Sequence, residues 1–134
     1  YYKNKFLKYI NPGFIKCVTD DNDELVAFAI TMPSFSNALK KINGKVDFFG
    51  KLRLLHAKNF NHKGSLYLIG VRPDFQNKGV IAILFNELQK FYNKFGITEV
   101  ETNPELIENA AIQQLWKNYE NNQHKNRATF TKQI

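Results

Sequence analysis

Apolar and polar positions divide the chain into short apolar runs and longer segments of helical period. Residues 14–19 and 25–32 are runs of strand length, and residues 20–23 between them, Asp-Asp-Asn-Asp, have the composition of a hairpin turn. A third apolar run covers residues 66–71 and ends before Pro73, which cannot donate to a sheet. The pattern therefore predicts a hairpin and, later in the chain, a third strand.

The period of the apolar positions changes at Val80 and stays helical to Phe95, and Gly96 follows as a stop. This predicts a helix over residues 80–95 that begins directly after a turn ending in Gly79. Unpaired N–H groups and the positive end of the helix dipole meet at such a start. The unit therefore suits a phosphate or a pyrophosphate.

Helical spacing also occurs before and between the strands. Residues 2–10 have the pattern of the end of a helix. Residues 34–64 form a helical insertion, whose first helix is begun by Ser34 or Ser36 and closed by Gly44. A second helix follows it within the insertion.

That second helix carries Phe48, Phe49, Leu52 and Leu55. We expect the insertion to act as a cover over the core that buries Phe35, Phe48 and Phe49. Residues 97–102 are predicted to form the next strand, and residues 128–134 a final short one.

The last predicted helix begins at Asn103, with Asn as the cap and Pro104 in the first turn. Its apolar face includes Ile112, Trp116 and Tyr119. Asn109 stands seven residues before Trp116, so the two are expected to share a face of this helix.

The segment VRPDFQNKGVIA, which starts at Val71, resembles the acyl-CoA-binding signature of the GNAT superfamily of N-acetyltransferases. The matching positions are Val71, Pro73, Phe75, Gln76 and Gly79. Ile81 departs from the signature, which usually has a small residue there. The resemblance runs from about residue 14 to about residue 119, and ETNPELxEN with a basic tail is similar to a little-characterised bacterial subgroup.

The resemblance implies an α/β (α+β) acyl-CoA N-acyltransferase fold. Its central sheet is mixed and mostly antiparallel, is flanked by helices, and contains a splayed parallel pair formed by residues 66–71 and 97–102. We expect residues 1–134 to be a single domain of this type that lacks the family's first strand and helix. Because the first residue is Tyr1 rather than Met, we expect the natural protein to continue upstream. An exposed sheet edge would favour a homodimer.

The resemblance also implies acyl transfer from acetyl-CoA, or another acyl-CoA, to an amine on a small molecule or peptide. The pantetheine arm would lie between the two parallel strands, pair with Ile69 and Val71, and lead to a pyrophosphate held by backbone amides. The expected cofactor-binding set is Ile69, Gly70, Val71, Gln76, Asn77, Lys78, Gly79, Val80, Ile81, Ala82, Asn109 and Trp116.

Proton transfer needs side chains with suitable pKa values. Glu101 is the preferred base, ahead of Glu99 on the same strand face, because Glu101 lies nearer the end where the parallel strands separate. The family's aromatic acid is often Tyr, but Trp116 stands at that position and indole is no acid at neutral pH. Tyr119 is therefore the nearest phenol that could act as the acid, with core packing as the alternative for Trp116 and Tyr119. Glu105, just beyond the strand, and Tyr67 are further candidate bases. His124 is a second-rank base.

Composition narrows the remaining choices. The net charge is +7, which fits either a coding bias toward lysine or a surface that attracts anions such as CoA phosphates. Cys17 is alone, so no internal disulfide forms and a reducing cytoplasm is expected, and the three histidines form no metal-ligand pattern with it. No stretch approaches the ~20 apolar residues of a membrane span, so we expect no membrane partner.

Three alternatives to a single-domain N-acetyltransferase stay open. One is a non-catalytic or degenerate acyl-CoA-binding domain, for which Trp116 and Ile81 are the reasons. Another is a basic nucleic-acid-binding module, disfavoured because clustered arginine and a known reading motif are absent. A third is an aminoacyl- or long-acyl-transferase built from paired domains. The insertion 34–64 has its own alternative, a wall or lid over the acceptor site.

Overall fold

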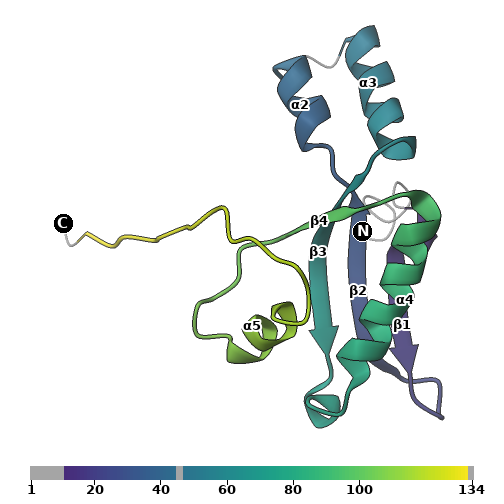
Figure 1. Cartoon of the computed structure of the whole chain (residues 1–134), viewed down its shortest axis with the longest axis vertical. Coiled ribbons are helices and arrows are strands. Elements are labelled where there is room, and N and C mark those ends of the chain that lie inside the picture. Colours follow the sequence, from purple (N-terminus) through teal and green to yellow (C-terminus); the bar gives the residue numbers. More distant parts are fainter. Residues whose placement is uncertain (1–10, 45–46, 133–134) are drawn as a thin grey trace. The chain divides into compact units, whose positions relative to one another are not determined.

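A four-stranded sheet in the order β1-β2-β3-β4 organises the larger part of the chain (Figure 1). The computed structural model describes residues 11–44 and 47–132. The chain forms two compact units, Tyr1–Glu101 and Thr102–Ile134. The helix predicted at residues 2–10 lies outside the described residues.

The strands fall where the apolar runs predict them. A 3-10 turn, η2 (Pro12–Phe14), leads into β1 (Ile15–Thr19), which pairs antiparallel with β2 (Leu25–Pro33). The third strand, β3 (Lys63–Val71), is antiparallel to β2 and begins three residues before the predicted run. Sheet order and direction confirm a mixed, mostly antiparallel sheet in which β3 and β4 are parallel.

The fourth strand and the helix before it complete this unit. Helix α4 (Val80–Phe95) has the predicted bounds, and both Gly79 and Gly96 flank it in the left-handed conformation. Strand β4 (Glu99–Thr102) begins two residues later than predicted, because Ile97 is buried in the turn that follows α4.

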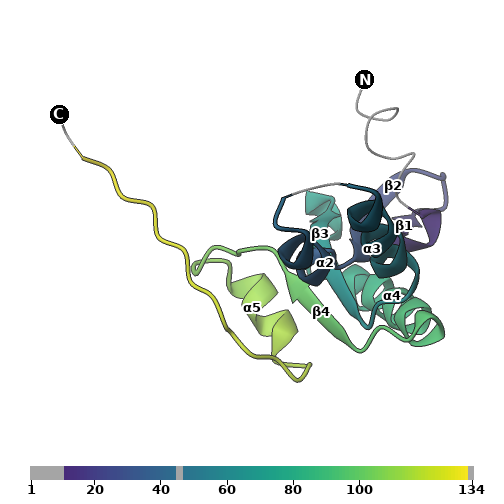
Figure 2. The same cartoon turned by 90° about the horizontal axis from the view of Figure 1, so that it is seen from above.

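The core lies between α4 and one face of the sheet. Ala27, Ala29 and Thr31 alternate along β2 and are at most 1% exposed, so small side chains line the strand beneath the helix. Leu84 and Leu88 are the most buried side chains of α4, each 1% exposed. Figure 2 shows α4 along one side of the sheet. Small residues on the strand let the helix approach closely, which fixes where its N-terminus lies.

The insertion is helical, as predicted. It consists of α2 (Ser36–Ile42) and α3 (Phe48–Asn59), and it extends past the end of the sheet where β3 begins (Figure 1). Phe35, not a serine, occupies the cap position of α2 and makes no side-chain cap bond. The Asp47 carboxylate accepts the Gly50 N–H at 2.7 Å and thereby begins α3.

The predicted burial of Phe48 and Phe49 is wrong. Their exposed fractions are 70% and 69%. The insertion instead buries Ala38, Ile42 and Gly50. The apolar residues of α3 are spread around the helix, so its two first-turn phenylalanines have no single face on which to be buried.

Two predictions for the C-terminal unit are also wrong. The helix α5 (Ala110–Trp116) begins six residues later than predicted, because its cap is Asn109 rather than Asn103: the Asn109 side chain accepts an amide of the first turn, the Ile112 N–H, at 3.4 Å. Residues 128–132 form no strand. Phe130 there is 89% exposed, so this segment buries no apolar face against a partner strand.

Candidate functional site

The connection between β3 and α4 presents backbone amides at the start of a long helix. It contains η3 (Pro73–Phe75) and then Asn77 and Gly79, both with positive φ, at 60° and 76°. Gly79 is the cap residue and no side chain caps the helix. The connection therefore turns the backbone without covering the first N–H groups of α4.

The amides around Gly79 differ in whether they already donate a hydrogen bond. The Ala82 N–H donates to the Gly79 carbonyl at 3.0 Å, so it is engaged inside the helix. For the amides of residues 77–81, no hydrogen-bond partner occurs among the described residues. The predicted anion site therefore has its available donors at Asn77, Lys78, Gly79, Val80 and Ile81.

Gly79 also leaves open space in front of these amides. A Cβ placed on it would meet no atom within 4 Å. Its φ of 76° is one that L side chains rarely adopt. The position thus combines a conformation suited to glycine with room for an incoming group.

Arg72 fixes this connection to the β1–β2 hairpin. Its guanidinium donates to Asp74 at 2.9 Å, to Glu24 at 3.3 Å and to Asp20 at 3.4 Å. It also lies over the Phe75 ring, 4.5 Å from the ring centre. The cluster was not predicted from the sequence, in which residues 20–23 have only the composition of a hairpin turn. The sequence feature that could have indicated it is Arg72 at the end of the third predicted strand, together with acidic residues in the turn of the first hairpin. These two ends come together once β3 pairs with β2.

The pKa values of Asp20 and Arg72 are both shifted in the direction that favours the charged form. The pKa of Asp20 is lowered, chiefly because the Glu24 amide donates to its carboxylate, with Arg72 as a smaller cause. The pKa of Arg72 is raised, chiefly by its hydrogen bond to Asp74. The charge of Arg72 is thus neutralised by its acidic partners. Lys78, whose ammonium lies 5.1 Å from the Phe75 ring centre, has no acidic partner in the described part of the chain.

The pairing of β2 with β3 decides which way the backbone of β3 points. The Arg72 N–H donates to the Val26 carbonyl at 2.8 Å, and Ala27 lies opposite Val71. In an antiparallel ladder, successive residues direct their N–H and C=O groups to opposite sides. Arg72 and Gly70 therefore face β2, whereas Val71 and Ile69 face the other edge.

Strand β4 accompanies only the first part of that edge. The Thr98 and Glu99 amides donate to the His62 carbonyl at 2.9 and 3.2 Å, so β4 starts level with the start of β3. At ~3.3 Å per residue, the four residues of β4 span roughly 13 Å and the nine of β3 roughly 30 Å. The paired part of the edge therefore ends before Ile69 and Val71.

Residues predicted on β3 have different roles in this geometry. Tyr67 is the extra residue of a bulge, since Ile30 opposes Leu68 and Thr31 opposes Leu66. The backbone of Gly70 faces β2, and a Cβ on it would lie 2.7 Å from the Phe28 ring, so glycine is needed there for packing. Gln76 is exposed, and its amide donates to the Pro73 carbonyl at 3.3 Å.

The predicted carboxylates on β4 are also distinguished. Glu99 is exposed and forms an ion pair with Lys63. Glu101 is half-buried, two residues further along the strand. The alternation of a strand places both on one face, with Glu101 nearer the end of the paired edge.

Three predicted residues lie in the C-terminal unit. The Asn109 side-chain oxygen caps α5. The Trp116 indole N–H donates to the Glu105 carboxylate, at 2.8 Å to the nearer oxygen, and its ring lies 6.3 Å from that of Tyr119. The indole N–H is thus already bonded, which agrees with a packing role for Trp116. The β3 edge and the amides of the connection belong to the other unit.

Two kinds of site have no counterpart in the described part of the chain. No three His, Cys, Asp or Glu residues in it lie together so as to hold a metal ion. Within residues 11–44 and 47–132, no helix combines the length and apolar character needed to cross a membrane.

Known proteins share this architecture. The model of the Acetyltransferase (GNAT) family matches residues 2–118. Aminoglycoside N-acetyltransferase AAC(6')-Iy in complex with CoA superposes with a TM-score of 0.58 at 17% identity, over 90% of this chain and 75% of that one. No curated protein sequence is a significant match.

Two further structures extend the range of similar folds. Aminoglycoside 6'-N-acetyltransferase AAC(6')-Ih from Acinetobacter baumannii gives a TM-score of 0.55 at 14% identity, over 90% of this chain and 69% of that one. Ribosomal-protein-alanine N-acetyltransferase from Brucella melitensis biovar Abortus 2308 gives 0.53 at 15% identity, over 87% and 70%. These similarities show the fold.

The Asp20 carboxyl provides a test of the Arg72 cluster. We predict that Asp20 titrates below the ordinary Asp range, and that Arg72→Gln raises its pKa only in part because the Glu24 amide is the larger cause. A lowered folded-state pKa stabilises the protein above the unfolded-state value, and this contribution is lost as pH falls through the folded value. Carbon-13 NMR titration of the Asp20 carboxyl group, in the unsubstituted protein and in Arg72→Gln, measures the two pKa values. An ordinary Asp pKa in the unsubstituted protein would contradict the geometry.

Proposed function

Because this chain belongs to the acetyltransferase (GNAT) family, we propose that it transfers an acetyl group from acetyl-CoA to an amine by direct attack on the thioester. The observation that carries this proposal is the continuity of two features of one unit. The outward-facing edge of β3 at Ile69 and Val71 leads directly into the connection whose amides meet at the start of α4.

The amides of residues 77–81 hold the pyrophosphate of the donor. They are the N–H groups without a partner among the described residues, and the α4 dipole adds partial positive charge at the same place. Lys78 supplies a full charge that no described acid neutralises, whereas Arg72 is occupied by three carboxylates. Arg72 thus positions the connection, and Lys78 adds attraction for the anion.

Ile69 and Val71 bind the pantetheine arm as an added strand. Their N–H and C=O groups face the edge beyond the paired part of β4, so they can exchange hydrogen bonds with the amides of the arm. Ile69 lies farther from the phosphate site than Val71 and nearer the bulge at Tyr67. Its N–H is therefore placed to polarise the thioester oxygen, as a preorganised donor does for developing negative charge.

Glu101 removes the proton of the attacking amine. An alkylamine has a pKa near 10.4, so it must lose a proton before it attacks. The thiolate of CoA has a conjugate acid with a pKa near 8.5 and leaves without an obligatory acid. Tyr119 is the secondary candidate for protonating it, and Tyr67 is a secondary candidate for the base.

The acceptor is an amine of a small molecule or a peptide. The similar structures carry names that span aminoglycosides and the alanine of a ribosomal protein. Acceptor pockets on one fold differ through their loops, so these names define the reaction class and leave the particular amine open. We place the enzyme in a reducing cytoplasm because Cys17 is free and exposed.

A non-catalytic acyl-CoA-binding domain is the second candidate. It is favoured by Trp116 at the family's aromatic position, because an indole is no acid at neutral pH and its N–H already donates to Glu105. Calorimetry with acetyl-CoA, followed by thioester turnover against aminoglycosides and peptide amines, separates the two. Binding with turnover supports the transferase, binding without turnover supports the second candidate, and absence of binding contradicts both.

Gly79→Ala tests the anion site, and Gly44→Ala is its matched control. Both glycines have a φ of 76° and open space around a new Cβ, but Gly44 lies between α2 and α3. We expect each variant to lose about 1 kcal/mol of stability from left-handed strain. Only Gly79→Ala should weaken acetyl-CoA binding, about tenfold, which corresponds to one lost charge-assisted hydrogen bond of ~1.5 kcal/mol. Equal acetyl-CoA affinities for the two variants would contradict this placement of the phosphates.

Glu101→Gln tests the proton acceptor, with Glu99→Gln on the same strand face as its control. We expect kcat to fall by ~10²–10⁴ in Glu101→Gln, because removal of a general base has effects of that size. The dissociation constant for acetyl-CoA should stay unchanged, since the carboxylate acts on the acceptor. Glu99→Gln should lose only its exposed ion pair with Lys63 and keep its activity. A similar kcat for both variants would exclude Glu101 as the base.

A further inference from the structure

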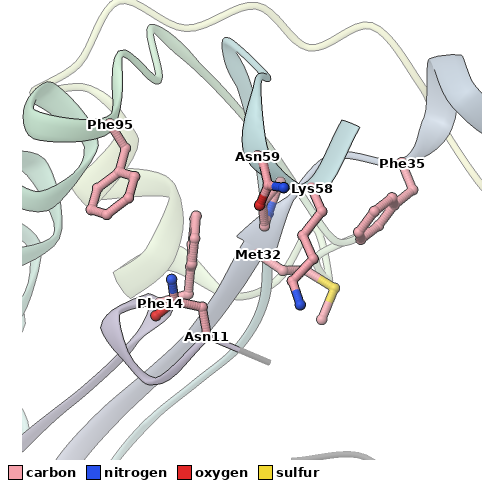
Figure 3. Close-up of a pocket in the computed structure, with 8 residues that line it drawn as sticks. Asn11, Phe14, Met32, Phe35, Lys58, Asn59 and Phe95 are labelled. Carbon is pink, nitrogen blue, oxygen red and sulfur yellow. The ribbon is translucent and has the colours of Figure 1, made fainter. Parts of the chain in front are cut away.

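A hollow lies at the end of the sheet opposite the β3–α4 connection (Figure 3). Five elements of the N-terminal unit or their flanks surround it, namely η2, β2, α2, α3 and α4. Its cavity volume is about 100 Å³ and its mouth is open to solvent, so it can take up one small ring while the rest of a ligand stays in the mouth. The residues that matter for its chemistry are Phe14, Met32, Phe35, Lys58, Asn59 and Phe95.

The hollow is separate from the proposed acetyl-CoA site. Pro33, which lines it, lies opposite Gly64 in the ladder, whereas Val71 at the other end lies opposite Ala27. Val71 follows Gly64 by seven positions along β3, which is roughly 23 Å at ~3.3 Å per residue. One small ligand cannot reach both sites.

The walls of the hollow are mainly aromatic. Phe14 is 4% exposed and its ring lies 6.2 Å from that of Phe95, which is 47% exposed. Figure 3 shows Lys58 extending past Met32, with Phe14 and Phe35 on either side. An apolar ring can therefore be partly enclosed here, and the thioether of Met32 adapts to its shape.

The charge of the lining selects the polar end of the ligand. Lys58 is the charged residue of the lining, and no acid lines the hollow within the described residues. Its ammonium has no ion pair in that part of the chain. The neighbouring Asn59 amide can donate a further hydrogen bond to an oxyanion. A protonated amine would be repelled by Lys58, so the hollow does not suit the acceptor of the transfer reaction.

We propose that this hollow is a second binding site for a small aromatic monocarboxylate, such as an arylacetate. Its ring packs among Phe14, Phe35 and Phe95, and its carboxylate binds Lys58 and Asn59. This inference does not depend on the acetyltransferase proposal.

The test uses the full chain, with 4-fluorophenylacetate as the probe and fluorine NMR as the measurement. We expect the probe to bind, and to bind more tightly than neutral 4-fluorophenylacetamide. Lys58→Met keeps the apolar stem but removes the charge, so it should weaken binding of the acid about fivefold and leave the amide unaffected. Lys51→Met on the same helix, outside the lining, is the matched control and should leave both affinities unchanged.

Several results would overturn the proposal. These are absence of binding, equal affinity for the acid and the amide, or an equal loss in Lys58→Met and Lys51→Met. Saturating acetyl-CoA should leave the affinity for the probe unchanged, and competition between them would place the probe at the β3–α4 end instead. Melting temperatures of the variants confirm that they are folded.

Discussion

The register between β2 and β3 is the constraint on which the proposed site depends. The bond from the Arg72 N–H to the Val26 carbonyl places Arg72 and Gly70 toward β2, and thereby turns Ile69 and Val71 toward the opposite edge. A shift by one residue would reverse this assignment and move every side chain of β3 to the other face. The bulge at Tyr67 allows this register at the C-terminal end of β3 while Leu66 stays buried in the core.

Arg72 connects that register to the anion site. It is the last residue to bond to β2, and its side chain joins acids from the hairpin turn and from the connection itself. Several weak, partly exposed ion pairs that share one guanidinium restrict the connection more than a single surface pair would. Gly79 then turns the chain into α4, whose position is fixed by close packing over the small residues of β2.

The parts that the sequence predicts correctly are those with strong local signals. Helix α4 has the predicted bounds because a sustained apolar stripe lies between two glycines that both adopt positive φ. The strands follow from apolar runs, and the amides near Gly79 follow from the strand–turn–helix order.

The failures have non-local causes. The sequence around Phe48 and Phe49 does not indicate that α2 and α3 bury Ala38 and Gly50 instead of these two phenylalanines. Both Asn103 and Asn109 are good caps, and only the structure decides between them. The Arg72 cluster joins positions about 50 residues apart, so it becomes visible only once β2 and β3 are paired in register.

Amide hydrogen exchange, resolved by residue, tests the central claim most directly. In the free protein, Ile69 and Val71 should exchange rapidly because their N–H groups face the outer edge, whereas Gly70 between them should be protected by β2. Saturating CoA should protect Ile69 and Val71 and leave Gly70 unchanged. Protection of Ile69 and Val71 equal to that of Gly70 in the free protein, or no change on addition of CoA, would contradict the account.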